Sequence, residues 1–353
     1  MTRVIVIGAG ISGLRVADLL TAAHIDVLLL ESRQRTGGRL HTVSGPTGPV
    51  DLGATWFWPH EGRVLSLIDE LGLPIHNQHL AGDAVYQDAQ RTRRLDGNPI
   101  DVPAGRFSLG AQDLAHRLAQ RLAPGCLATD RPVLAVSART DGLRVETGAG
   151  ALEAEHVVLA LPPALAVSRI RFDPALPATL VDLARRTPTW MGSMAKVVAV
   201  FDSAFWRDHG LSGAAISHVG PMRELHDMSG PAGRPAALFG FAPLPTADSV
   251  APEPDAIVRQ LSALFGPSTP EPVELYIADW RSEPDTSPPD TGVAGDYRTY
   301  GHPAWRTAAL DGRLHWSATE TSSTSPGHIE GALERAETVA ARIIDDLNRR
   351  NAA

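Results

Sequence analysis

The sequence contains a single cysteine, a single lysine and no apolar run long enough to cross a bilayer. With Cys126 alone there can be no internal disulfide, which is typical of proteins in a reducing compartment. The apolar start at residues 4–7 lacks the basic residues and cleavage site of a signal peptide, so we predict a strand there. The best candidate for a spanning helix is broken at Leu161-Pro162-Pro163. We therefore expect a cytoplasmic protein with no membrane partner.

Positive charge is also scarce, since 32 Lys and Arg stand against 40 Asp and Glu and the net charge is −8. This balance gives no electrostatic reason to expect a nucleic-acid partner. With 353 residues and 43% hydrophobic residues, the chain can form two globular domains. Five histidines lack the spacing of metal ligands, and we expect no metal site: His60, His76, His79, His218 and His226.

The first forty residues have the pattern strand, turn, helix, strand. Residues 3–7 are β-branched and apolar, residues 14–23 have helical spacing, and residues 26–30 form a second apolar run. This βαβ opening predicts a parallel sheet covered by helices. Residues 133–161 instead predict a small antiparallel meander whose last strand returns to the parallel sheet.

Glycines 8, 10 and 13 form a G-x-G-x-x-G turn between the first strand and the helix. Gly8 permits a tight turn, Gly10 lets a pyrophosphate approach the backbone, and Gly13 lets the helix pack closely. Glu31 ends the second strand, where a carboxylate accepts hydrogen bonds from ribose hydroxyls. The pattern predicts a bound dinucleotide; the alternative is a glycine-rich turn in an unrelated α/β protein.

The run E-x-R-x-R-x-G-G-R at residues 31–39 resembles the flavin-dependent amine oxidase family of monoamine, polyamine and L-amino-acid oxidases. Residues 51–56 are similar to the family segment along the flavin ring, and Val133 matches the position that meets the adenine. The resemblance implies FAD, held noncovalently because Asp296 stands where covalent members carry cysteine. The expected FAD contacts are Gly8, Gly10, Ser12, Gly13, Glu31, Ser32, Arg33, Gly38, Arg39, Gly53, Ala54, Thr55, Trp56, Val133, Glu320 and Ile329.

Lys196 is the one lysine among 32 basic residues, and apolar neighbours flank it. Residues 192–198 resemble the family strand whose lysine holds a water against flavin N5 and assists hydride transfer or reaction with oxygen. A desolvated ammonium loses its proton readily, whereas a guanidinium does not. The alternative is a surface lysine in a strand.

The C-terminal residues 313–321 and 328–332 look like the closing motif of the family, in which a helix begins under the flavin and stabilises its reduced form. A strand, loop and helix that close any α/β domain are the alternative. The resemblance also places Trp280 at the flavin face and makes Tyr297 one of two aromatic residues around the amine, although a core tyrosine explains Tyr297 equally well. His328 replaces the second aromatic residue, and its imidazole could stack, bond substrate or accept a proton. The expected catalytic residues are Lys196, Tyr297, His328 and Trp280.

The predicted fold is α/β. A Rossmann-like FAD domain of the glutathione-reductase type would comprise residues 1–77, 125–186 and 285–350. A reduced α+β substrate domain on a mixed sheet would comprise residues 78–124 and 187–284. Little room lies between Tyr86 and residues 105–122 for the helical subdomain that usually covers the cavity. The resemblance thus implies a shortened member whose site is open, or is covered by a second copy or a carrier protein.

The predicted reaction is FAD-dependent oxidation of a C–N bond in an amine or amino acid, with hydride transfer to flavin N5 and oxygen as acceptor. Two alternatives remain open at this point. One is a desaturase or dehydrogenase that acts on C–C bonds and uses another acceptor. The other is a flavoprotein without catalysis whose open face binds a partner.

Overall fold

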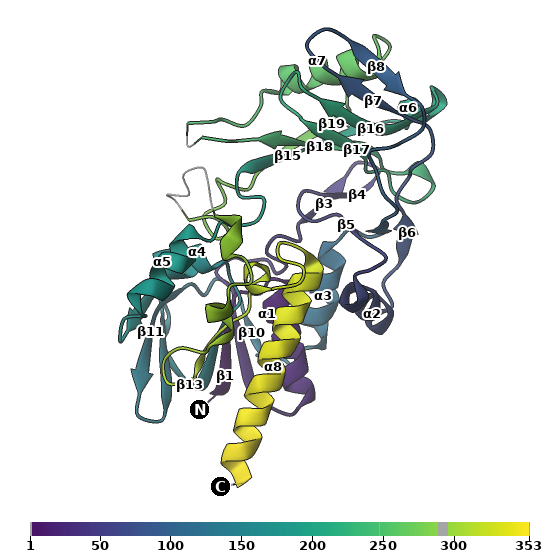
Figure 1. The fold of residues 1–353 in the computed structure, drawn as a ribbon. Helices are drawn as coiled ribbons and strands as arrows, with labels where there is room; N and C mark the ends of the chain where they lie inside the picture. The colour runs from purple at the N-terminus through teal and green to yellow at the C-terminus, as the bar shows by residue number, and fades with distance from the viewer. Residues whose placement is uncertain (1, 247, 289–295, 353) are drawn as a thin grey trace.

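The computed structural model describes residues 2–246, 248–288 and 296–352, which form two large sheets with helices packed on each (Figure 1). The first sheet has the order β10-β2-β1-β13-β12-β11-β14, and β20 pairs with β13. Its strands are β1 (Thr2–Ile7), β2 (Val27–Leu30), β10 (Leu127–Ala128), β11 (Val133–Arg139), β12 (Gly142–Thr147), β13 (Gly150–Leu159), β14 (Arg171–Asp173) and β20 (Leu314–Trp316).

The pairing in this sheet confirms the predicted meander. Strand β13 pairs antiparallel with β12 through Leu143↔Ala154, and parallel with β1 through Val6↔Val158. Because successive side chains of a strand point to opposite faces, β1 contributes side chains to two hydrophobic cores, one on each face of the sheet. Val4 and Val6 face a core with helices α1 (Ile11–Ala22), α2 (Gly62–Leu71), α3 (Gln112–Arg121) and α8 (Ile329–Ala352). Ile5 and Ile7 face the core of α4 (Pro163–Arg169) and α5 (Ala178–Arg186).

One core beside the first sheet contains helices α1, α3 and α8. Helix α1 begins at Ile11, three residues before the predicted start, so that its N-terminus directly follows the glycine turn. Helix α8 buries an apolar stripe that extends from Ile329 to Leu347, and it runs beside α1 on the side of the molecule away from the second sheet (Figure 1). Helix α3, which the predicted division places in the substrate domain, packs into the same core as α1.

The second sheet has the order β19-β15-β18-β17-β16-β7-β8 and is mixed, because β16 and β7 are parallel while the other pairs are antiparallel. Its strands are β7 (Asp83–Gln87), β8 (Thr92–Leu95), β15 (Met194–Phe201), β16 (Leu211–Ser217), β17 (Glu224–Asp227), β18 (Ala236–Pro243) and β19 (Glu274–Asp279). Helices α6 (Phe205–Asp208) and α7 (Pro254–Phe265) cover one face.

Strand β15 explains how the single lysine reaches the interior. Val197 and Ala199 point into the core under α6 and α7, whereas Val198 and Val200 point to the opposite face. That face packs against Val50 from the N-terminal segment. Lys196 shares the alternation of Val198 and therefore points toward the first sheet and not toward α7.

The remaining elements are short. They are β3 (Thr42–Gly45), β4 (Gly48–Asp51), β5 (Trp56–Phe57), β6 (Ile75–Asn77), β9 (Gly105–Phe107), and the 3₁₀ turns η1 (Pro231–Gly233), η2 (Tyr297–Thr299), η3 (Pro303–Arg306) and η4 (Thr319–Thr321). Residues 88–111, all of them described, form β8 and β9 and contain no helix. Among the described helices, none is both long and apolar enough to span a membrane.

Candidate active site

A cavity of about 680 Å³ lies between the two sheets. Most residues expected at FAD line it: Gly8, Gly10, Ser12, Glu31, Ser32, Arg33, Gly38, Arg39, Gly53, Ala54, Thr55, Trp56, Val133 and Ile329. Three of the four expected catalytic residues, Lys196, Trp280 and His328, line it as well. Gly13, Glu320 and Tyr297 do not, and each has a different place.

The glycine turn is shaped by close contacts that only glycine permits. Gly8 has a φ of 101°, and a Cβ there would lie 2.7 Å from the carbonyl oxygen of Ala160. A Cβ on Gly13 would lie 1.9 Å from the carbonyl oxygen of Gly8, so Gly13 serves helix packing and not the cavity. A Cβ on Gly10 would meet only one atom, at 4.0 Å, which leaves the backbone open to a phosphate. The N-terminus of α1 therefore offers N–H groups to the cavity, as a pyrophosphate requires.

Glu31 is buried at the end of β2 and is held by its neighbours. One carboxylate oxygen accepts a hydrogen bond from the backbone N–H of Ala9 at 2.7 Å, and the other accepts from the backbone of Arg33 at 3.0 Å. These bonds fix the carboxylate beside the glycine turn, where its remaining lone pairs can accept from ribose hydroxyls.

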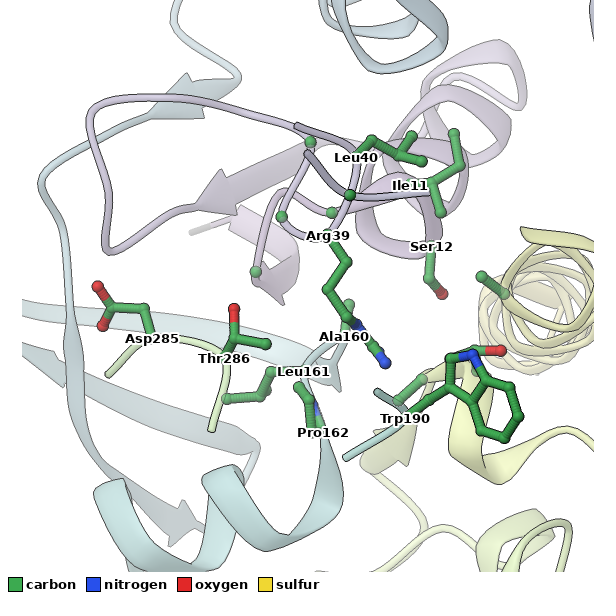
Figure 2. A pocket seen from close by; sticks show the side chains of 18 of the residues that line it. Ile11, Ser12, Arg39, Leu40, Ala160, Leu161, Pro162, Trp190, Asp285 and Thr286 are labelled. Carbon is green, nitrogen blue, oxygen red and sulfur yellow. The ribbon is translucent and has the colours of Figure 1, made fainter. Parts of the chain in front are cut away.

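Arg39 and Glu320 form a two-point ion pair at the cavity wall, with distances of 2.6 and 3.2 Å. Glu320 is fully buried and also accepts the backbone N–H of Trp190 at 3.1 Å. Burial opposes the charge of Arg39, but the Glu320 carboxylate outweighs it and raises the pKa of Arg39. Figure 2 shows Arg39 extending toward Pro162 and Trp190. Glu320 thus does not line the cavity itself but holds Arg39 in place. Arg39 presents a permanent positive charge that suits a phosphate.

Lys196 is 3% exposed, in agreement with the expected burial. Its Nζ donates a hydrogen bond to the Gly53 carbonyl oxygen at 2.8 Å and lies 4.6 Å from the Phe239 ring. Burial lowers the pKa of Lys196 to about 7, although the negative charge of Asp51 opposes this shift. Near neutral pH the amine therefore exists in both protonation states and can donate or accept a proton.

Trp280 forms part of the same wall. Its indole N–H donates to the Leu52 carbonyl oxygen at 3.0 Å, and the Trp280 carbonyl accepts from the Ser287 hydroxyl at 2.9 Å. The indole is 6% exposed, so its orientation is fixed by these bonds and by burial. It provides a flat apolar surface on the cavity.

His328 lies at the cavity between two tryptophans. It stacks on Trp58, with ring centroids 5.0 Å apart and an angle of 28°, and it contacts Trp190 at 6.2 Å. Its Nδ1 lies 3.0 Å from a carboxylate oxygen of Glu61, which is 2% exposed. Trp58, Glu61 and Trp190 all line the cavity but were not predicted as site residues. Glu61 lies only five residues after the predicted segment 51–56, and Trp190 lies two residues before segment 192–198. Their closeness in sequence to these two segments is the signal that could have identified them as site residues.

Tyr297 is 53% exposed and contacts Trp190 at 6.1 Å. Trp190 thus contacts both Tyr297 and His328, while no ring contact joins Tyr297 to His328 in the described part of the chain. The tryptophans that contact His328 at the cavity are therefore Trp58 and Trp190, whereas Tyr297 does not contact it among the described residues.

Groups that could hold a metal ion are absent from the residues described: no three His, Cys, Asp or Glu side chains are suitably placed. The residues present do fit FAD. The N-terminus of α1, Glu31 and Arg39 supply the donors and acceptors for its phosphates and ribose, and Lys196 and Trp280 line the same cavity.

Comparison with known proteins identifies the family of the chain. The family "Flavin containing amine oxidoreductase" matches residues 11–109 and 106–344. The chain is 27% identical to the putative flavin-containing monoamine oxidase AofH of Mycobacterium tuberculosis, over 96% of each chain. It is 24% identical to the putrescine oxidase of Kocuria rosea, over 97% of this chain and 95% of that one.

Two solved structures confirm the predicted fold class. Putrescine oxidase bound to putrescine matches with a TM-score of 0.86 and 24% identity, over 98% of this chain and 99% of the other. Cyclohexylamine oxidase from Brevibacterium oxydans IH-35A matches with a TM-score of 0.87 and 23% identity, over the same shares. The alignment with AofH covers 443 positions, 90 more than the 353 residues of this chain, which makes the chain a shortened relative.

Proposed function

Because the chain belongs to the family of flavin-containing amine oxidoreductases, we propose that it oxidises a small amine, and not an amino acid, with oxygen as electron acceptor. Membership favours amine oxidation over the C–C dehydrogenase and the non-catalytic flavoprotein. FAD, bound noncovalently as in most of the family, supplies the two-electron acceptor for the hydride that leaves the carbon next to nitrogen.

The preference for an amine rests on the charges around the cavity. Four arginines line it, and all of them come from segments attached to the first sheet: Arg33, Arg39, Arg131 and Arg169. The strands of the second sheet contribute Met194, Lys196, Glu224 and Phe241 to the cavity, and no arginine among their described residues. Glu61 adds a second carboxylate to that of Glu224, and it lies beside His328. An ammonium or amine is favoured beside carboxylates and aromatic rings, whereas a substrate carboxylate would be repelled.

The side chains around the cavity have three different roles in this reaction. Trp58, Trp190 and Trp280 provide flat surfaces that exclude water and orient the amine. Lys196 holds or moves a proton at Nζ, with the Gly53 carbonyl fixing its direction. Arg39 and the N-terminus of α1 bind the phosphates of the cofactor.

Matched pairs of compounds test this proposal. Phenethylamine and phenylalanine, or tyramine and tyrosine, differ by one carboxylate on the reacting carbon. We expect the amines to release hydrogen peroxide with this protein and the amino acids to release at least tenfold less. Turnover of the amino acid at an equal or higher rate would contradict the proposed preference of the cavity for amines.

Three further features belong to the proposal. The domain division at residues 77, 124, 186 and 284 is supported by the two sheets, with α3 as the element that packs across it. A cytoplasmic location is supported by the single cysteine. A second copy or a carrier protein over the cavity is suggested by the shortened segment 88–111.

A further inference from the structure

We propose that Glu61 and His328 form a proton-accepting pair that converts a bound ammonium into the neutral amine before it is oxidised. This inference rests on the proposed function. It assigns a catalytic role to His328 and a positioning role to Glu61.

The hydrogen bond to Glu61 determines which nitrogen of His328 can accept a proton. An ionised carboxylate only accepts hydrogen bonds, so the nitrogen that faces it, Nδ1, must carry a hydrogen. In the neutral ring the lone pair then resides on Nε2. Among the described residues no hydrogen-bond partner occupies Nε2, and the ring lines the cavity. Nε2 is therefore available to a ligand.

Glu61 also fixes the ring in space. Its second carboxylate oxygen accepts the backbone N–H of Trp58 at 3.0 Å, and Trp58 is the residue on which His328 stacks. Trp190 contacts the ring as well, at an angle of 52°. One buried carboxylate thus sets the tautomer of the imidazole and holds the indole beneath it. A purely structural histidine would not need an ionisable partner that is 2% exposed.

Other charges surround this pair. Glu330 lies two residues after His328, in the first turn of α8. Its carboxylate accepts hydrogen bonds from the backbone N–H groups of Arg63 and Val64 and is therefore not bonded to the His328 ring. Glu320 is paired with Arg39 behind Trp190. Lys196 and Glu224 reach the cavity from the second sheet, and Glu224 is bonded to His226. Glu61 is therefore the carboxylate directly bonded to the His328 ring.

The chemistry of the step is a simple proton transfer. An alkylamine arrives as an ammonium at neutral pH and has no free lone pair. The N–H bond of the ammonium breaks and a new N–H bond forms at Nε2, which leaves a neutral amine and an imidazolium stabilised by Glu61. No electrons are exchanged in this step. Only the neutral amine can release hydride, because its lone pair stabilises the positive charge left on carbon.

The test compares E61Q, H328N and wild type as holoproteins in anaerobic stopped-flow reduction of the flavin by phenethylamine. A general base contributes on the order of 100-fold or more, so both variants should be slower by about that factor at pH 7. The defect should shrink as pH approaches the pKa of the amine, and with a less basic fluorinated amine, because both supply neutral substrate. His60→Asn is the matched control, since His60 is exposed and also stacks on Trp58, at 6.5 Å.

A second readout does not depend on activity. In protein labelled with ¹⁵N-histidine, the resonances missing from H328N identify His328 among the 13 histidines. We expect its proton on Nδ1 in wild type and on Nε2 in E61Q, because the glutamine amide can donate to Nδ1. Variants that are equally slow at every pH, or an unchanged tautomer in E61Q, would overturn the pair while amine oxidation stands. A wild-type flavin that no amine reduces would instead overturn the proposed function.

Discussion

The Nζ of Lys196 donates a hydrogen bond of 2.8 Å to the carbonyl oxygen of Gly53, and this bond joins the second sheet to the segment beside the cavity. The Nζ of Lys196 also lies 4.6 Å from the Phe239 ring, and the charges of Asp51 and Arg106 act on it. A lysine held in this way is oriented by one acceptor and has lost most of its hydration, which explains its depressed pKa.

The first prediction concerns that pKa. Because Lys196 is the only lysine, protein labelled with ¹³C-lysine has one side-chain signal, and its ¹³Cε shift against pH should give a pKa of about 7. Lys196→Met should slow flavin reduction or reoxidation by on the order of 100-fold while the yellow cofactor stays bound. A titration near the ordinary value, together with unchanged kinetics, would contradict the role assigned to Lys196.

The second prediction concerns the glycine turn. Gly13→Ala places a Cβ against the Gly8 carbonyl, so α1 must move away from the turn and FAD affinity should fall at least tenfold. Gly62→Ala is the control, because a Cβ there meets nothing within 4 Å at the start of α2. Reconstitution of the apoprotein, followed by flavin fluorescence, gives both affinities. Equal affinities would argue against the turn as the pyrophosphate site.

The sequence predicted those parts of the molecule that depend on local pattern. The glycine turn and the meander at residues 133–161 each follow from neighbours in the chain. The Glu61–His328 contact could not be predicted in this way, because it joins residues 267 positions apart. The same holds for the contact between Trp190 and Tyr297, which are 107 positions apart in the chain.

The third prediction concerns Glu320. Glu320→Gln leaves Arg39 without its ionic partner, and the amide keeps only one oxygen to accept from Arg39 and from the Trp190 N–H. Breaking a buried pair costs about 3–5 kcal/mol, so the free energy of unfolding should fall by several kcal/mol in urea titration. Glu337→Gln is the control, because Glu337 pairs with Arg63 on the surface and such pairs contribute about 0–1 kcal/mol. Comparable losses in both variants would contradict the assigned role of the Arg39–Glu320 pair.

The fourth prediction concerns acid stability. His156 and His315 are buried in contact, with 3.1 Å between Nδ1 and Nε2, and burial lowers their pKa values to about 4 and about 3. In the unfolded chain these histidines bind protons near pH 6.5, whereas in the folded chain they bind protons only at about pH 4 or below. Because the unfolded state binds more protons between these values, acid favours unfolding. Between pH 7 and 5 the free energy of unfolding should fall by about 2 kcal/mol for one such histidine.

Urea unfolding at the two pH values measures this loss, and His315→Phe should reduce it. His24→Asn, at an exposed site, is the control and should leave the pH dependence unchanged. A stability that stays constant from pH 7 to 5 would contradict the burial of two neutral imidazoles.

The most direct test of amine oxidation in this cavity is the visible spectrum of the purified holoprotein, recorded without oxygen while phenethylamine is added. We expect the band of oxidised flavin to bleach and air to restore it. A flavin that stays oxidised with phenethylamine and with every other amine would contradict the proposed function. A protein that cannot be reconstituted with FAD at all would contradict the cofactor site itself.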